Sequence, residues 1–330
     1  MLLKDKIFFG SHNSITGNVH SIDQLCYSEQ LYKLFEGKSH AFKMICETFF
    51  MNWCKCQSLS IKDQLHAGIR FFDFRVYLDD GKCLFHHEIM RVNNPNSINV
   101  FQRILSFLNN NPDEIIILRF SSVKGSDKDN IKMQKKFIKL IHKKFRQFLF
   151  PTSYDILNHS IENILKTPYR IICISDLRKK NDSFIYSPNS LETNYNEKQI
   201  TVKNIIDNNL EYYKKKSSDT TIFKVFQCHK QCTLDYIKKN TLKPGYSMLN
   251  IMKDFQEKNY ESLVSNIEFN NGIVTLNNSK HINKKVGDFI KEHHMFTTNK
   301  DKKDNVKKIN IIQLNNVNKE HIQYIQNSLH

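Results

Sequence analysis

Glycine and proline are scarce in this chain, which holds 9 Gly and 6 Pro among 330 residues. Hydrophobic residues make up 40% of the chain and charged residues 25%. This composition excludes a disordered polymer, because such chains have too few apolar residues to bury a core. A chain of this length buries roughly 75% of the surface that it exposes when unfolded, so one large α/β domain needs no disulfide or metal to hold it together.

Long hydrophobic runs are also missing. No window approaches the ~20 apolar residues that a bilayer-spanning helix requires, so we expect any membrane contact to be peripheral. The N-terminus carries Lys4 and Lys6 and turns polar by Gly10, unlike a secretory signal peptide. The eight cysteines follow no regular framework, which is typical of reduced thiols in a cytosolic protein. We therefore expect a cytoplasmic protein that associates peripherally with membranes.

Several ligand-binding motifs are absent. The chain contains neither G-x-G-x-x-G nor G-x-x-x-x-G-K-[ST], which counts against nucleotide binding. Cys54 with Cys56, and Cys228 with Cys232, are candidate zinc half-sites, but the usual C-x-x-C spacing is lacking. The sequence therefore predicts no metal and no cofactor.

The chain has a strong positive charge. Its 49 Lys and Arg against 33 Asp and Glu give a formal charge of +16. Such a surface attracts polyanions, either nucleic acid or an anionic membrane leaflet. The lysine runs at 214–216 and 302–303 are typical of solvated loops, and no nucleic-acid recognition motif accompanies them. We expect an anionic membrane surface as the partner and no nucleic acid.

The order of the predicted elements indicates the fold class. Short β-branched and aromatic runs alternate with longer helical patterns, as in a parallel sheet with crossover helices. The predicted strands are 3–9, 69–77, 114–120, 170–175, 221–227 and 309–314, a hairpin turn lies at 79–81, and the predicted helices are 58–67, 100–108 and about 128–148. This count favours a single, distorted and closed (β/α) barrel of the TIM type over an open doubly wound sheet.

Two polar stretches interrupt this pattern. Residues 178–200 and 277–308 are rich in Asn, Lys and Ser, which is typical of surface-loop insertions. We expect both insertions to belong to one catalytic barrel that spans residues 1–330.

Ionisable residues cluster at three strand ends, where a parallel barrel has its active site. They are the loop GSHNS at 10–14, Asp73 with Arg75, and the doublet His86-His87. Strand alternation points Asp73 and Arg75 to the same face, where they form either a structural ion pair or part of a site. Two imidazoles and one guanidinium suit phosphodiester cleavage by an internal hydroxyl: one His removes a proton, the other donates one, and Arg holds the phosphoryl oxygens.

These motifs resemble a known family. GSHNS, CQSLSIKDQLHAGIRFFDFRVY, LFHHE and NNNPDEIIIL are similar, in order and in strand context, to the X-domain of phosphatidylinositol-specific phospholipase C. The resemblance is dense over residues 5–120 and recurs at KVFQC and NIIQLNNV. The stretch 53–75 is particularly similar to trypanosomal glycosylphosphatidylinositol phospholipase C and to proteins that consist of the X-domain alone. The resemblance implies a distorted (β/α) barrel that cleaves phosphatidylinositol or a glycosylated form of it to diacylglycerol and a cyclic inositol phosphate.

The resemblance also implies roles for individual residues. His12 corresponds to the general base, Arg75 to the phosphate-binding arginine and Asp73 to the carboxylate that helps to hold the site together. His87 corresponds to the general acid, although Glu88 replaces a family glycine and leaves His86 as an alternative. Metal-dependent members carry an acidic ligand where this chain has Arg75, so calcium-independent chemistry is implied, because a guanidinium supplies no ligand and repels the ion.

Three departures from the family pattern each remove an acid. Asn13 stands where metal-independent members usually carry Asp, and Asn315 replaces the Asp of the late strand. Arg119 and Ser122 stand where the motif I-L-D-F-x-H has Asp and His. An Asn can orient an imidazole but does not stabilise an imidazolium as a carboxylate does. The alternative is therefore a catalytically weakened barrel that binds inositol phospholipid headgroups or a protein partner.

Overall fold

The structure is a computed structural model of the chain. It describes residues 1–19, 25–27, 36–37, 55–79, 82–87, 90–92, 94–125, 130–156, 158–176, 182–194, 202–215, 223–228, 283–288 and 310–327, together with His40, Lys43, Asn250 and Glu257.

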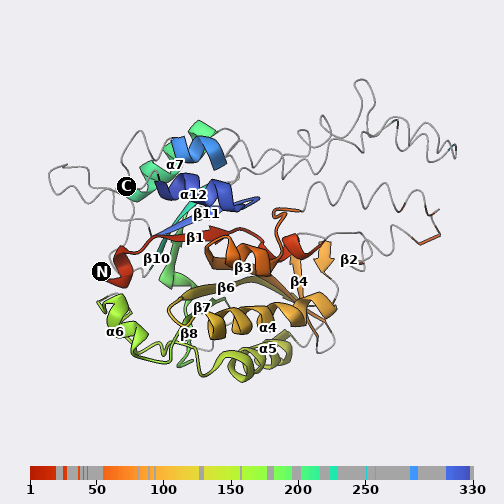
Figure 1. Cartoon of the computed structure of the whole chain (residues 1–330). Coiled ribbons are helices and arrows are strands. Elements are labelled where there is room, and N and C mark those ends of the chain that lie inside the picture. The colour runs from red at the N-terminus through yellow and green to blue at the C-terminus, as the bar shows by residue number, and fades with distance from the viewer. Residues whose placement is uncertain are drawn as a thin grey trace.

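A curled parallel sheet forms the centre of the molecule (Figure 1). Its strands follow the spatial order β8-β7-β6-β3-β1-β11-β10-β9, with every neighbouring pair parallel. The bounds are β1 Phe8–Ser11, β3 Ile69–Asp79, β6 Ile116–Gly125, β7 Ile171–Ser175, β8 Ile185–Tyr186, β9 Leu191–Thr193, β10 Phe223–Cys228 and β11 Ile311–Leu314. This arrangement confirms the predicted α/β barrel class.

One short segment links the two ends of this sheet. β8 pairs with β7 and β9 pairs with β10, and only the 3-10 helix η4 (Pro188–Ser190) separates β8 from β9 along the chain. Among the described residues, the first and last strands of the sheet are therefore joined by this short connection along the chain, and no ladder pairs them.

An antiparallel extension carries the histidine doublet. β3 continues past its parallel partner β1, and on that side it pairs with β4 (Lys82–His87). β4 pairs with β5 (Met90–Val92), and β5 pairs with β2 (Leu25–Tyr27). The antiparallel pairing of β3 with β4 agrees with the predicted hairpin, and residues 80–81 of its turn lie outside the described residues. It brings the end of β4 toward the same edge of the sheet as the end of β1.

Helices cover the outside of the sheet. α4 (Asn94–Asn110) and α5 (Asn130–Phe145) lie below it in Figure 1, and α7 (Val202–Lys215) and α12 (Lys319–Asn327) lie above it. The short helices are η1 Leu3–Asp5, η2 Ser14–Asn18, α3 Ile61–His66 and α6 Ile161–Leu165. α3 begins where the Ser60 side chain accepts a hydrogen bond from the Asp63 backbone N–H, and it stops before Gly68, whose φ of 101° suits a residue without a Cβ. Within the described residues, no helix has the length and apolar character needed to cross a bilayer.

Alternating strand residues build two apolar layers. Phe72, Phe74 and Phe120 belong to the layer under the helices, where the Phe120 ring lies 5.2 Å from that of Phe137 in α5. The residues between them point into the barrel and form a buried second layer, which includes Phe8, Phe71, Ile117, Ile172 and Ile311. This apolar layer occupies the amino-terminal half of the barrel, so polar side chains gather at the carboxyl ends of the strands.

Three predicted elements need correction. Residues 3–5 form η1 and not the start of a strand, because the Lys6 N–H donates to the Leu3 carbonyl and closes a turn, so β1 begins only at Phe8. The stretch 178–200 is not simply a loop insertion: β8 and β9 lie within it, with buried apolar side chains inside polar flanks. Helix α4 begins at Asn94 rather than at 100. Of the insertion 277–308, residues 283–288 are helical and the remainder lies outside the described residues.

Gly17 sits in η2, directly after the loop that carries His12. A Cβ at this position would lie 1.8 Å from the Leu59 carbonyl oxygen, and this backbone atom cannot move aside cheaply. We expect Gly17→Ala to lower the free energy of unfolding by about 3 kcal/mol, at the upper end of overpacking costs. The measurement is urea denaturation, with the exposed Lys62→Ala on α3 as the control, expected within about 0.5 kcal/mol of the unchanged protein. An unchanged midpoint for Gly17→Ala would refute this close approach.

Candidate active site

His12 lies directly after β1, and Asn315 lies directly after β11. The parallel pairing of Ser11 with Leu314 brings the two following residues side by side, and the His12 N–H donates to the Leu314 carbonyl oxygen at 3.0 Å. His12 Nδ1 and Asn315 Oδ1 are 3.0 Å apart. Because an amide oxygen only accepts, Nδ1 carries the proton in this contact, which leaves Nε2 of a neutral ring as an acceptor. Asn315 therefore lies beside His12.

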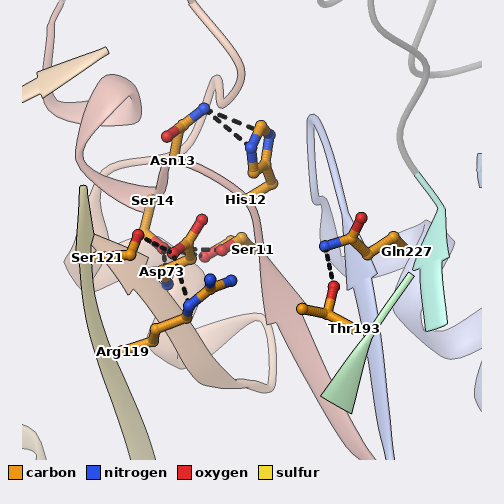
Figure 2. Close-up of polar contacts among 9 residues, drawn as sticks. All are labelled: Ser11, His12, Asn13, Ser14, Asp73, Arg119, Ser121, Thr193 and Gln227. Atoms are coloured by element: carbon orange, nitrogen blue, oxygen red, sulfur yellow. Dashed lines mark hydrogen bonds and ion pairs between the residues drawn. The ribbon is translucent and has the colours of Figure 1, made fainter. Parts of the chain in front are cut away.

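Asn13 forms the sharp turn after His12. Its φ of 46° is left-handed, a conformation that Asn tolerates better than most residues. Its Nδ2 lies 3.1 Å from His12 Nε2 and donates to Cys56 Sγ at 3.6 Å, and Figure 2 shows this amide against the imidazole. The Asn13 Oδ1 is buried without a hydrogen-bond partner. An amide thus occupies the position next to His12 where a carboxylate was expected in metal-independent relatives.

The two histidines of the doublet have different surroundings. The His87 ring centre lies 6.0 Å from that of His12, with the rings edge to face at 81°. The His86 ring lies 6.1 Å from that of Tyr77, also edge to face. In the structure, His87 is therefore the histidine of the doublet whose ring lies beside that of His12.

Asp73 of β3 is in contact with the neighbouring strand β6 and with η2. Its Oδ1 accepts a hydrogen bond from the Ser121 hydroxyl at 3.2 Å and lies 3.8 Å from Arg119 Nε, and its backbone N–H donates to Ser14 Oγ at 2.9 Å. Figure 2 shows this cluster below His12 and Asn13. The ion pair of this carboxylate thus involves Arg119 of the neighbouring strand β6. Asp73 is buried, whereas about a quarter of the Arg119 side chain (23%) is exposed.

Arg75 lies two residues beyond Asp73 on β3, and its backbone pairs with Ser121 of β6. It is partly exposed, and strand alternation places it on the same face as Asp73, one layer closer to the opening of the barrel. Among the described residues, no group of three or more His, Cys, Asp or Glu side chains is arranged to hold a metal ion.

Two residues at the site were not predicted from the sequence, namely Gln57 and Cys56. Gln57 is fully buried, and its Nε2 donates to the carbonyl oxygens of His12 at 2.8 Å and Leu314 at 3.0 Å. Its Oε1 accepts from the Val317 N–H at 3.0 Å. One amide therefore fastens the ends of β1 and β11 and fixes the separation of His12 from Asn315. The Cys56 sulfur lies 3.7 Å from His87 Nδ1.

Polar groups also line the opposite wall. Gln227 of β10 donates through Nε2 to the Thr193 hydroxyl of β9, facing the Asp73 cluster across the barrel in Figure 2. Gln313 of β11 is fully buried, and neither of its amide atoms has a hydrogen-bond partner. The barrel is therefore polar on both walls above its apolar layer.

Known proteins resemble this chain in sequence and in fold. No family model matches the chain. Over 174 residues, the chain is 26% identical to a PI-PLC X-box domain-containing protein of Dictyostelium discoideum; the match covers 53% of this chain but only 21% of that protein. The phosphatidylinositol-specific phospholipase C of Listeria monocytogenes superposes with a TM-score of 0.53 at 13% identity, covering 99% of this chain and 94% of that one. The Staphylococcus aureus enzyme, in work on its membrane binding, gives a TM-score of 0.58 at 13% identity, covering 100% and 94%.

This chain has the fold of the phosphatidylinositol-specific phospholipases C. The resemblance to the X-domain family that the motifs indicate is thereby confirmed, in the sequence by the Dictyostelium relative and in the fold by the two bacterial phospholipases. The chain spans about a fifth of the length of the Dictyostelium protein that it matches.

Proposed function

We propose that this chain is a phosphodiesterase that cleaves phosphatidylinositol, or a glycosylated form of it, to diacylglycerol and a cyclic inositol phosphate. The observation that carries the proposal is the pair of facing imidazoles of His12 and His87, 6.0 Å apart at the carboxyl ends of the strands of a phospholipase C fold. Two imidazoles this close can both reach one phosphodiester bound beside them, one as the proton acceptor and the other as the proton donor.

His12 is the proposed general base. Its Nδ1–H is held by the Asn315 amide oxygen, which turns Nε2 toward the substrate. Nε2 takes the proton of the inositol 2-hydroxyl while the hydroxyl oxygen attacks phosphorus and closes a five-membered ring. Because the Asn13 amide now lies 3.1 Å from Nε2, a substrate hydroxyl replaces that contact when it binds.

His87 is the proposed general acid. As the bond between phosphorus and the diacylglycerol oxygen breaks, His87 donates a ring proton to that oxygen, so the leaving group departs as a neutral alcohol. His12 gains one proton and His87 loses one, so the total number of protons in the site does not change. After the products leave, proton exchange with water returns both histidines to their starting protonation states.

Arg75 is the proposed phosphate ligand. A guanidinium presents parallel N–H donors that match two phosphoryl oxygens, and its charge opposes the negative charge that builds on them in the transition state. The charge of Arg75 is also the reason to propose chemistry without calcium. The guanidinium would repel a divalent cation from the place where the phosphate binds. Asp73 and Arg119 support this wall of the site through their ion pair.

We also propose that the chain reaches its lipid by peripheral contact with an anionic membrane surface. The formal charge of +16 favours such a surface, and each Lys or Arg close to it contributes roughly 1 kcal/mol. Nothing in this proposal requires nucleic acid.

The contact between Asn315 and His12 leads to a prediction about the pKa of the proposed base. Its amide orients His12 but supplies no charge to stabilise the imidazolium that forms during catalysis. We expect Asn315→Asp to raise the pKa of His12 above that in the unchanged protein and to increase turnover on phosphatidylinositol by about 10-fold, since one pKa unit corresponds to about 1.4 kcal/mol. The acidic limb of the pH profile of kcat/KM should move to higher pH, because a base with a higher pKa is protonated at higher pH.

Asn318→Asp is the matched control for this variant. Asn318 caps α12 by accepting the His321 N–H, a role that Asp also fills, so the control adds the same charge without altering the capping contact. Turnover that is unchanged or lower in a folded Asn315→Asp protein, or raised equally in the control, would count against the proposed role of this position.

A second function is favoured by the amides around His12. Both Asn13 and Asn315 lie within hydrogen-bond distance of the ring, and neither supplies the negative charge of a carboxylate. A barrel that binds inositol phospholipid headgroups without cleaving them would keep these contacts and lose turnover.

Incubation with lipid separates the two functions. Phosphatidylinositol in detergent micelles, with chelator present, should release diacylglycerol, whereas phosphatidylcholine should not, because choline has no hydroxyl that can attack the phosphorus. Sedimentation with phosphatidylinositol vesicles in the absence of any release would identify the binding protein instead. Release that requires added calcium would contradict the role given to Arg75.

A further inference from the structure

The side chain of Cys56 lies between the proposed acid and the loop of the proposed base. Its Sγ is 3.7 Å from His87 Nδ1, and it accepts a hydrogen bond from Asn13 Nδ2 at 3.6 Å. Cys56 is buried, with 2% of its surface exposed. The sulfur thus contacts the histidine on the ring nitrogen that would face away from a substrate bound at Nε2.

The backbone of Cys56 fixes the position of this sulfur. The Cys56 N–H donates to Thr16 Oγ1 at 3.1 Å, and the Cys56 carbonyl oxygen accepts from the Asn316 N–H at 2.7 Å. The first contact ties Cys56 to the loop after β1 and the second ties it to the turn after β11. The thiol is therefore held by the same two strand ends that carry His12 and Asn315.

The two histidines consequently have partners of different chemistry. His12 Nδ1 meets an amide oxygen, which cannot gain or lose a proton at ordinary pH. His87 Nδ1 meets a thiol, which can give its proton to the ring and become a thiolate beside an imidazolium. An amide partner leaves a ring neutral, as a base must be, whereas an ionisable partner stabilises the protonated ring that an acid must be. The Asn13 N–H directed at the sulfur further favours the thiolate.

We propose that Cys56 is the positioning residue of the general acid: it passes its thiol proton to His87 Nδ1, so that His87 is an imidazolium when its Nε2 proton goes to the leaving oxygen. This inference rests on the proposed phosphodiesterase function. The S–H bond breaks as the Nδ1–H bond forms, and the Nε2–H bond breaks as the alcohol O–H bond forms. The pair is left as a thiolate and a neutral imidazole, one proton short, and water returns that proton after the product leaves.

A comparison of two leaving groups tests this role. Phosphatidylinositol loses an alkoxide, which needs the acid, whereas an inositol 4-nitrophenyl phosphodiester loses a nitrophenolate, which departs without a proton. We expect Cys56→Ala and Cys56→Ser to lower kcat on phosphatidylinositol by about 10- to 100-fold, less than the loss of the acid itself, and to change kcat on the nitrophenyl ester by less than about threefold. Cys228→Ala, at a buried thiol of β10, is the control and should affect both substrates equally and weakly.

Equal losses on the two substrates in the Cys56 variants would overturn the proposal, because a purely structural role does not depend on the leaving group. If the unchanged protein cleaves neither ester, the proposed phosphodiesterase function is overturned, and the role of Cys56 as a positioning residue in that reaction is overturned with it.

A titration without substrate separates these two failures. The thiolate of Cys56 is followed by absorbance near 240 nm, as the difference between the unchanged protein and Cys56→Ser. If the thiol and the ring share a proton, Cys56 should ionise at least one pH unit lower in the unchanged protein than in His87→Gln. If Cys56 ionises at the same pH in both proteins, Cys56 and His87 do not share a proton. This result would hold whether or not the protein is an enzyme.

Discussion

Replacing His12 with Ala should lower kcat on phosphatidylinositol by about 10²–10⁴-fold, the usual contribution of a general base. The loss follows from the position of the ring, which is held by Asn315 at Nδ1 and faces His87 across 6.0 Å. Initial rates of diacylglycerol release from mixed micelles measure the effect, and a thermal melt verifies that the variant is folded.

His66→Ala is the matched control for that experiment. His66 is an exposed histidine of α3 whose ring lies against Phe107, 5.9 Å away, and it belongs to no part of the site. His86→Ala is a second comparison, and it should have a small effect if His87 alone is the acid. A folded His12→Ala protein that keeps more than half of its activity would exclude the proposed base, and equal collapse of the His86 and His87 variants would leave no basis for choosing between the two rings.

Replacing Arg75 with Ala should cost about 10²–10³-fold in kcat, the range observed when a donor to developing charge is removed. Arg75→Lys should recover only part of the activity, because an ammonium keeps the charge but lacks the paired donors that fit two phosphoryl oxygens. The variants should differ from the unchanged protein in kcat more than in KM, since charge builds on the phosphoryl oxygens only in the transition state.

Arg103→Ala is the control for Arg75, because it removes one positive charge from an exposed position of α4. This control matters because the chain is strongly cationic, and a lost charge can weaken membrane contact without touching the site. If Arg75→Ala and Arg103→Ala reduced activity equally, the effect of Arg75 would be electrostatic attraction to the lipid surface and not phosphate binding.

The strands of the barrel were predictable where side chains repeat regularly. IRFFDFRVY and EIIILRF combine alternation or continuous apolar character with β-branched residues, and they became β3 and β6. β8 and β9 escaped prediction because each is two or three residues long, which is too short for any periodicity to emerge from polar surroundings. Residues 3–5 were misassigned because they lead directly into the apolar run of β1, while their backbone instead closes a 3-10 turn.

The site was predictable only as far as strand ends reveal it. His12 follows β1 and the His86-His87 doublet ends β4, so their convergence at one edge of the barrel could be inferred from topology. Cys56 and Gln57 lie in an irregular segment that leads into α3. Their contacts with His87 and His12 depend on how the loop packs against two turns, which no local pattern encodes. Their one sequence signal was their place at the start of the segment CQSLSIKDQLHAGIRFFDFR, whose resemblance to the family extends upstream of the strand.

Phosphorus NMR of the water-soluble product tests the proposed mechanism most directly. The product is formed from phosphatidylinositol in detergent micelles with chelator. Internal attack by the 2-hydroxyl predicts the downfield signal of a five-membered cyclic phosphodiester as the first product, absent with His12→Ala. An acyclic inositol monophosphate as the first product would exclude internal attack by the 2-hydroxyl. A cyclic signal that appears only after calcium is added would exclude the metal-independent mechanism. An unchanged lipid phosphorus signal from a protein that binds the micelles would exclude the proposed phosphodiesterase activity.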